Sequence, residues 1–228
     1  MLGVDSRPGE RKALLFSAGG ARLALRLSQL REILPVPPDG ELRVRDEVVP
    51  GAFAAVVLGL PPGPAPFAIL TEGAPATALR VEAVHGIVDL AEAEVFQLPS
   101  RTPLPQPAPF AGAIVHRGEV ALELAVSSLG WAPLEPALER SDPPPDLGPS
   151  VERELTFARG PRRFGVPLSI LLGVLEGPRV APLPLAPASY RGLLYHGRAL
   201  FPVRDVAVLY GDAPVTAPRS VLLLDAGG

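Results

Sequence analysis

The stretch YRGLLYHGRALFPVRDVAVLYG, residues 190–211, decides the fold, because two other parts of the chain repeat its plan. Two β-prone apolar runs flank the polar turn His196-Gly197-Arg198, whose glycine can adopt a positive φ. Asp205 is placed to cap a short helix over residues 206–210, and Gly211 suits the left-handed position at its end. The stretch therefore predicts a β-hairpin followed by one turn of helix.

The same plan recurs in residues 48–59, VVPGAFAAVVLG, and in residues 118–130, GEVALELAVSSLG. In the first of these, a proline and a glycine keep the spacing of nine that separates Pro202 from Gly211. In the second, Glu123 is a weak candidate for the cap. Pro202 interrupts an apolar run and predicts an edge strand or a bulge, because proline donates no ladder hydrogen bond.

A longer repeat precedes these hairpins. LLFSAGGARLALRLSQLREILPVPP, from Leu14, and LTFARGPRRFGVPLSILLGVLEGPR, from Leu155, align without a gap at an offset of 141 and share nine identical residues. Each reads as two strands around a glycine turn, then a turn of helix that Ser28 or Ser169 would cap, with leucines at helical spacing. The chain begins the same fold twice.

The repeat sets the expected domain organisation. We expect a mobile lead-in over residues 1–12, a first unit over residues 13–133, a proline-rich linker over residues 134–152 and a partial second unit over residues 153–228. With 30 prolines and 23 glycines, the chain is divided into short elements. An all-β fold with short helical turns only is predicted.

Composition excludes several classes of function. The net charge is −3 and no long basic run occurs, so nucleic-acid binding is not expected. The chain has no cysteine, which removes disulfides and thiolate chemistry. Residues 48–70 carry no charge, but five prolines make a membrane-spanning helix implausible. With no signal-like apolar segment at the N-terminus, we expect a cytoplasmic protein without direct membrane insertion.

Candidate chemical residues are few. No two histidines, among His85, His116 and His196, have metal-ligand spacing, so we expect no metal and no cofactor. A catalytic triad of Ser127 or Ser169 with His196 and Asp205 lacks a nucleophile-elbow motif, and no catalytic residue or enzymatic activity is expected. The arginines around Gly160 are interpreted as a solvated hairpin tip.

The order of these motifs resembles the CheW family of chemotaxis coupling proteins. The resemblance is carried by the LxFxxGGxxxAL start, the helical turn LSxLxEIL, the VVP and LFPVRD segments, and the later hairpin ALRVEAVHGIVDL leading into LPSRTPLP. It covers one whole domain in the first unit and the first half of another in the second unit. It implies two five-stranded, SH3-like β-barrels per domain.

The family has a central motif similar to NLRGxxxPVxDL, and each unit carries part of it. In the first unit, Arg45 and Pro50 fall at its Arg and Pro, while Asp46 replaces its Gly and Phe53 its Asp. The resemblance associates the Arg with receptor contact, so Arg45 and Asp46 are candidate partner-binding residues.

In the second unit, Gly197, Pro202 and Asp205 match the motif, and His196 stands where the motif has Arg. His196 and Arg198 are therefore candidate partner-binding residues. The resemblance associates the Asp with local folding, so Asp205 is expected to be a structural cap.

The function implied by the resemblance is that of a non-catalytic adaptor in chemosensory two-component signalling, linking a CheA-type histidine kinase to methyl-accepting chemoreceptor tips or related partners. The alternative is a diverged structural or regulatory protein that no longer couples receptors. A half-domain leaves an apolar face bare, so we also expect the second unit to dock on the first, or to self-associate with a second molecule. The residues expected to be buried there are Leu168, Leu171, Val174, Leu193 and Leu222.

Overall fold

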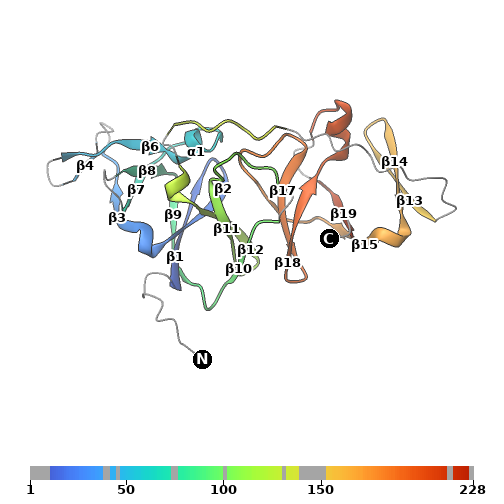
Figure 1. Ribbon diagram of the computed structural model, residues 1–228, viewed down its shortest axis with the longest axis horizontal. Helices are drawn as coiled ribbons and strands as arrows, with labels where there is room; N and C mark the ends of the chain where they lie inside the picture. Colours follow the sequence, from blue (N-terminus) through green and yellow to red (C-terminus); the bar gives the residue numbers. More distant parts are fainter. Residues whose placement is uncertain are drawn as a thin grey trace.

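The computed structural model of the protein is built mainly from β-strands, with short helical turns between them (Figure 1). The predicted all-β class is confirmed. The structure describes residues 11–37, 42–44, 47–72, 77–99, 102–129, 132–138, 153–214 and 218–225.

The larger sheet of the first unit has six strands in the order β10-β11-β12-β2-β1-β9. The pairing of β12 with β2 is parallel, and the other pairs are antiparallel. Its strands are β1 (Lys12–Ala18), β2 (Ala21–Arg26), β9 (Ala83–Asp89), β10 (Glu94–Phe96), β11 (Phe110–His116) and β12 (Glu119–Leu124).

The smaller sheet of the first unit has the order β3-β7-β8-β6. Its strands are β3 (Leu30–Pro35), β6 (Gly51–Phe53), β7 (Phe67–Thr71) and β8 (Ala78–Val81). η2 (Leu27–Gln29) connects the larger sheet to the smaller one. The pair β4 (Arg43–Val44) and β5 (Glu47–Val48) and the helix α1 (Ala54–Val57) lie between strands of the smaller sheet, and η3 (Val126–Ser128) follows β12. The main core joins both sheets, with Phe16 and Leu122 from one and Ile69 and Leu79 from the other. Strand pairing shows sheets of six and four, so closure into five-stranded barrels stays a prediction.

The second unit forms three small sheets, β13-β14, β15-β19 and β16-β17-β18. Its elements are β13 (Glu154–Arg159), β14 (Arg162–Pro167), η4 (Leu168–Ile170), β15 (Leu171–Glu176), β16 (Val180–Ala181), β17 (Tyr190–His196), β18 (Ala199–Arg204), η5 (Val206–Tyr210) and β19 (Ser220–Leu224).

The repeat at an offset of 141 is visible in the elements themselves. Adding 141 to the bounds of β2, η2 and β3 gives the bounds of β14, η4 and β15. The β3–β7 and β15–β19 pairs also share one register, since Leu30 faces Thr71 as Leu171 faces Leu224, and a bulge follows each leucine. The two units thus start with the same local structure.

The hairpin predicted from residues 190–211 is confirmed. β17 and β18 are joined by a two-residue turn, Gly197 and Arg198 both have positive φ, and β18 is an edge strand that accommodates Pro202. Asp205 caps η5 by accepting from the Ala207 N–H. The hairpin has the lengths, turn and bulge of β11–β12 at an offset of 80.

The helical interpretation of the segment after Ser28 is wrong. The helical turn spans three residues, neither Ser28 nor Ser169 caps it, and Leu30–Pro35 is a strand. The bulge after Leu30 explains the error, because it interrupts the alternation of apolar residues and leaves a spacing that resembles a helix. Glu123 is also not a cap, since it lies within β12.

The second unit packs on the first through part of its surface. Leu183, Leu185 and Leu193 belong to the main core of the first unit, and β17 lies beside β12 (Figure 1). The expected linker begins as a bound segment, with the Leu134 N–H donating to Val57 and the Ala137 N–H to Leu185.

Burial of the five predicted leucine and valine residues is mixed. Leu193 is fully buried, and Leu171 and Leu222 are half-buried. For Leu168 and Val174 the prediction is wrong within one molecule, because both are exposed. The reason is that β16, β17 and the segment before β17 reach the first unit, whereas β15 and η4 lie away from it (Figure 1).

Candidate interaction site at the junction of the two units

The turn between β17 and β18 contacts β10 of the first unit through Glu94. The Tyr195 hydroxyl donates to Glu94 Oε1 over 2.5 Å, and the Arg198 Nε lies 3.5 Å from Glu94 Oε2. Phe96 packs edge-on against the Tyr195 ring, with 5.9 Å between the ring centroids. One carboxylate and one aromatic ring of β10 therefore hold the hairpin turn.

Glu94 also changes the acidity of Tyr195. The hydrogen bond to the Glu94 carboxylate raises the pKa of the Tyr195 hydroxyl above its ordinary value of 10.0, and burial and the charge of Glu94 act in the same direction. The positive charge of Arg198 opposes them. Tyr195 is therefore a protonated donor to Glu94 across the neutral pH range.

A cavity of about 550 Å³ opens beside this turn, between the two units. Its wall on the first unit holds the ion pair of Arg22 and Glu119, 2.5 Å apart. The second unit contributes Glu176, Arg179 and His196. The lining residues are Gly20, Arg22, Gly118, Glu119, Val120, Leu175, Glu176, Pro178, Arg179, Val180, Ala181, Pro182, Leu194, Tyr195 and His196. Side chains of both charge signs line the cavity, and two of them neutralise each other, so it is not a selective site for a small anion.

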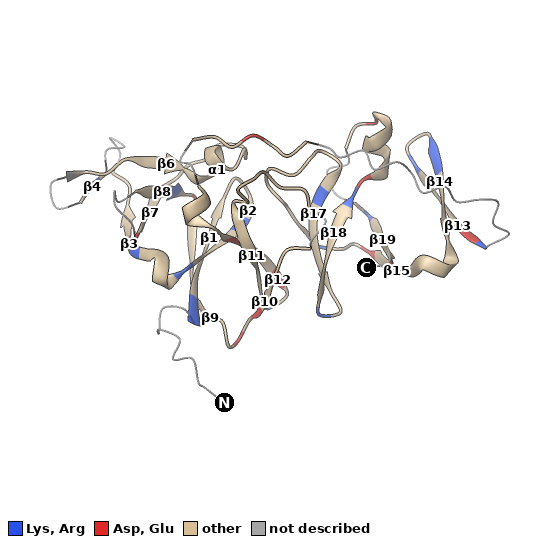
Figure 2. Cartoon of the chain, viewed as in Figure 1, with Lys and Arg blue, Asp and Glu red and all other residues tan. Residues whose placement is uncertain are grey.

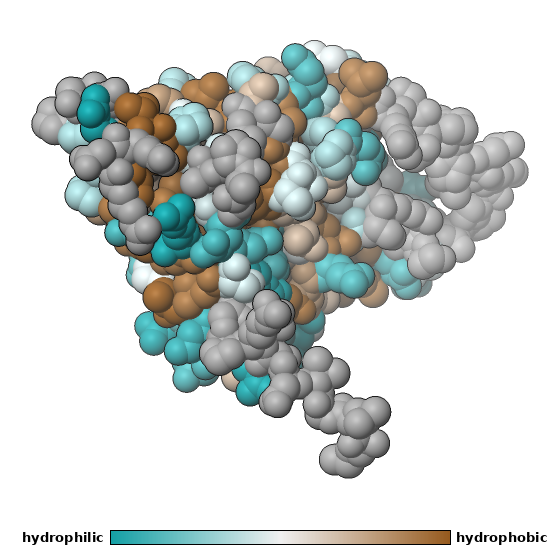
Figure 3. Space-filling view, turned by 60° about the vertical axis from the view of Figure 1, so that its left-hand side comes forward, coloured by the Kyte–Doolittle hydropathy of each residue, from teal (hydrophilic) through white to brown (hydrophobic). Residues whose placement is uncertain are grey.

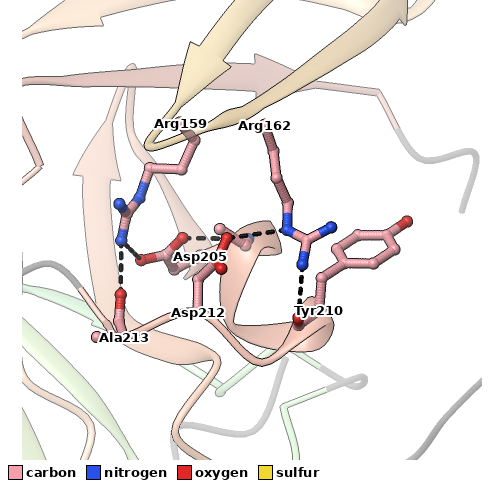
Figure 4. Close-up of polar contacts among 7 residues, drawn as sticks. Arg159, Arg162, Asp205, Tyr210, Asp212 and Ala213 are labelled. Carbon is pink, nitrogen blue, oxygen red and sulfur yellow. Dashed lines mark hydrogen bonds and ion pairs between the residues drawn. The ribbon is translucent and has the colours of Figure 1, made fainter.

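A second polar network surrounds the cap of η5, where Asp205 is almost fully buried (Figure 4). The Arg159 guanidinium, at the end of β13, donates to Asp205 Oδ2 and to the Ala213 carbonyl, each over 2.9 Å. Beside it, Arg162 donates to Asp212 over 3.0 Å and to the Tyr210 carbonyl over 2.9 Å. The tip of the β13–β14 hairpin is therefore anchored on η5, and the prediction of a simply solvated tip is wrong.

The structure places the predicted site residues in two different places. His196 and Arg198 are exposed at the β17–β18 turn, where His196 lines the cavity. Asp205 follows the other end of β18, roughly 20 Å away along a strand of this length. The geometry therefore does not support the triad that would join His196 to Asp205. Arg45 and Asp46 lie outside the described residues.

Sequence reasoning missed Glu94, Phe96 and Tyr195 as junction residues. Tyr195 is 101 residues from Glu94 along the chain, and neither residue belongs to a motif that signals contact. The T-shaped ring pair and the hydrogen bond depend on how the two units pack, which no local pattern encodes.

Charge is distributed over both units, with arginines and carboxylates at strand ends and turns (Figure 2).

At the end of the molecule that holds β4 and β6, hydrophobic patches alternate with hydrophilic ones (Figure 3). Exposed apolar side chains here are Val48 of β5, Phe53 of β6 and Val56 of α1, and the Arg80 guanidinium lies 5.3 Å from the centre of the Phe53 ring. Within the described ranges, no three His, Cys, Asp or Glu residues are grouped to hold a metal ion. None of the helices in that part of the chain has the length and apolar character to span a bilayer.

Comparisons with known proteins give one family. A model of the CheW-like domain matches residues 12–130, just over half of the chain. Among solved structures, the chain is similar to the scaffolding protein TtCheW from Thermoanaerobacter tengcongensis, with 17% identity and a TM-score of 0.42, over 50% of this chain and 88% of that one. No curated protein matches the chain.

Proposed function

Because the chain belongs to the CheW-like domain family, we propose that it is an adaptor that links a CheA-type histidine kinase to methyl-accepting chemoreceptors in the cytoplasm. The observation that carries the proposal is the family match over residues 12–130, which spans both sheets of the first unit. Proteins of this family are non-catalytic scaffolds for chemotaxis signalling, so the chain acts through surface complementarity rather than through a reaction.

The first unit supplies a scaffold on which two partners can bind at separate places. Its two sheets share one core and present different edges, β10 and β9 in one sheet and β3 and β6 in the other. Exposed Phe53 and Val56 provide apolar contact area next to β6, which protein partners use at the centre of an interface. We assign the receptor contact to the segment of Arg45 and Asp46, whose guanidinium can form forked hydrogen bonds with a receptor carboxylate.

The second unit adds a separate surface at the junction. Exposed His196 and Arg198 stand beside the cavity, where they can bind a partner segment of mixed charge. In this proposal the junction tunes the affinity for a partner, while Asp205 maintains the fold.

One observation favours the alternative, a structural or regulatory protein of the same family that no longer couples receptors. The position of the family's motif Asp holds Phe53, an exposed ring that stacks with Arg80. No side chain caps α1 at this position, and an arginine-covered aromatic ring takes the place of the carboxylate, so the local surface differs from that of a motif-bearing member.

Binding assays separate the two functions. The full chain would be immobilised and offered, in separate experiments, the regulatory domain of a CheA-type kinase and the cytoplasmic tip of a chemoreceptor from the same genome. The adaptor predicts retention of both. Retention of the kinase alone would favour the alternative, and retention of neither would reject both functions. Arg198→Glu tests the junction, with Arg163→Glu, an exposed arginine on β14, as the matched control.

A further inference from the structure

Strand β19 has an open edge. One of its edges pairs with β15, and no strand in the described part of the chain pairs with the other. The Asp225 N–H, just after β19, donates to the Ile170 carbonyl at the start of β15. Because the backbone groups of successive residues in a strand point to opposite edges, those of Leu222 and Leu224 point to the open edge. This edge can accept a further strand.

The repeat shows what occupies the corresponding edge in the first unit. The counterpart of β19 is β7, because the β3–β7 and β15–β19 pairs share one register. The other edge of β7 is occupied by β8, which runs antiparallel to it. Thr71 is the counterpart of Leu224, and its N–H donates to the Thr77 carbonyl over 3.0 Å. The first unit therefore defines both the kind of occupant, an extended strand, and its register.

The side chains beside the open edge match such a strand. In the first unit, Leu79 of β8 lies opposite Ile69 of β7, and both are buried in the main core. A strand added to β19 in this register places a large apolar side chain beside Leu222, the counterpart of Ile69. It would lie on the outward face of the β15–β19 sheet, where Val174 is 47% and Leu224 38% exposed. The added side chain would cover this apolar area.

Two further contacts define the composition of the added strand. Ala78 of β8 lies opposite Leu70, and Leu223, the counterpart of Leu70, is buried against the β17–β18 hairpin. A small residue is therefore required opposite Leu223. At one end of the outward face, the Glu176 carboxylate accepts from the Ser220 hydroxyl over 2.9 Å. The added strand should therefore be apolar opposite Leu222 and polar towards this end.

Strand β13 is open in the same way. Its counterpart β1 pairs with β2 on one edge and with β9 on the other, whereas β13 pairs only with β14 within the described ranges. β9 follows β8 directly in the chain. The two edges left open in the second unit are therefore the two that one continuous segment, β8 and β9, fills in the first.

We propose that the open edge of β19 binds an extended segment of a partner protein, which adds as an antiparallel strand in the place that β8 takes on β7. Main-chain hydrogen bonds supply the affinity of such strand addition, and alternate side chains supply its specificity. The β8 strand of this chain, or of a second copy, is already committed, because β6 and β7 pair with its two edges. The partner segment has a large apolar residue opposite Leu222 and a small one opposite Leu223.

Fluorescence anisotropy with a labelled synthetic peptide tests the proposal on the full chain. The peptide has the sequence of residues 77–90, TALRVEAVHGIVDL, because β8 and β9 carry the required pattern. We expect saturable one-to-one binding with a Kd below about 1 mM.

Two N-methylated peptides test the main-chain hydrogen bonds. In the first unit the Thr77 carbonyl faces β7 and the Ala78 N–H faces β6, so the N–H groups of Leu79 and Val81 also face β7. N-methylation of Leu79 and Val81 removes the donors to β19 and should weaken binding by at least about tenfold. N-methylation of Ala78 and Arg80 is the matched control, since these groups point away from β19, and should change the Kd by less than about threefold.

A variant of the chain tests the edge itself. Leu224→Pro removes an N–H at the open edge and keeps the hydrogen bonds to β15, and Leu224→Ala shortens the side chain but keeps the N–H. We expect Leu224→Pro to weaken peptide binding by at least about tenfold, and by more than Leu224→Ala does. Leu224 is 38% exposed at an edge, so both variants should melt as the wild type does.

Three results would overturn the proposal: no saturable binding of the unmodified peptide, equal binding of the two N-methylated peptides, or binding that Leu224→Pro leaves unchanged. Sedimentation equilibrium of the wild-type chain tests the other occupant. A dimer that Leu224→Pro abolishes would make a second copy of the chain the occupant of the edge, and would also overturn the proposal.

Discussion

Replacement of Asp205 by alanine is the substitution whose effect the structure defines best. The buried carboxylate accepts from the Ala207 N–H over 3.3 Å and from the Arg159 guanidinium over 2.9 Å. Loss of an N-cap costs about 1 kcal/mol, and loss of a hydrogen bond to a charged group about 1.5–3 kcal/mol. Arg159 is a quarter exposed and keeps the Ala213 carbonyl, so the lower values apply.

We therefore expect Asp205→Ala to lower the free energy of unfolding by about 2–3 kcal/mol. This loss of stability exceeds that of a cap alone, because the substitution also removes the pairing with Arg159, which the sequence did not reveal. In a chain of this length the change corresponds to a fall in Tm of roughly 5–10 °C. Urea denaturation followed by circular dichroism measures the first quantity, and a thermal scan the second.

Two further variants isolate the cause. Asp205→Asn keeps an oxygen for the cap and removes the charge, so it should fall between the wild type and Asp205→Ala. Asp212→Ala removes the neighbouring pair with Arg162, which is more exposed and should cost less than about 1 kcal/mol. The reasoning would be refuted if Asp205→Ala destabilised the protein no more than Asp212→Ala.

Three other outcomes are expected. Gly192→Ala should destabilise the protein by about 2–4 kcal/mol in urea denaturation, because φ is 141° and a Cβ would collide with a carbonyl of β16; Gly197→Ala, at an open turn, should cost less. The pKa of Tyr195 is raised above 10.0 by its hydrogen bond to Glu94. The stabilisation from this hydrogen bond is therefore complete below about pH 10 and is lost as pH rises through the raised pKa. Glu94→Gln should shift the pKa of Tyr195, followed by tyrosinate absorbance, toward 10.0. The absence of any shift would contradict the Glu94–Tyr195 hydrogen bond at the junction. Arg45→Ala should weaken receptor binding, measured by calorimetry, without lowering Tm; the reverse would count against its assignment.

The hairpin at residues 190–211 could be predicted because its signals are local. A glycine at a turn, an acidic residue before a short helix and a glycine at its end each specify their own backbone conformation. The repeat gave the bounds of the second unit's first elements for the same reason. The helical prediction for the segment after Ser28 was wrong because the bulge in β3, set by pairing with β7, disrupts the alternation of apolar and polar residues that indicates a strand.

Long-range packing could not be predicted from local signals. The chain passes from β8 in the smaller sheet directly into β9 in the larger one, where β9 pairs with β1, and nothing in its sequence selects that partner. The Glu94–Tyr195 contact and the burial of Leu193 depend on how the second unit meets the first. The exposure of Leu172 and Val174 likewise depends on which parts of the second unit reach the first.

Adaptor function is tested most directly by measuring whether the chain bridges its two partners. Membranes that contain chemoreceptors would be sedimented with a CheA-type kinase from the same genome, with and without the full chain, and the kinase in the pellet would be quantified. We expect the chain to join the pellet and to raise the amount of kinase there in proportion to the chain's own concentration until saturation. A pellet with the same kinase content whether or not the chain is present would contradict it.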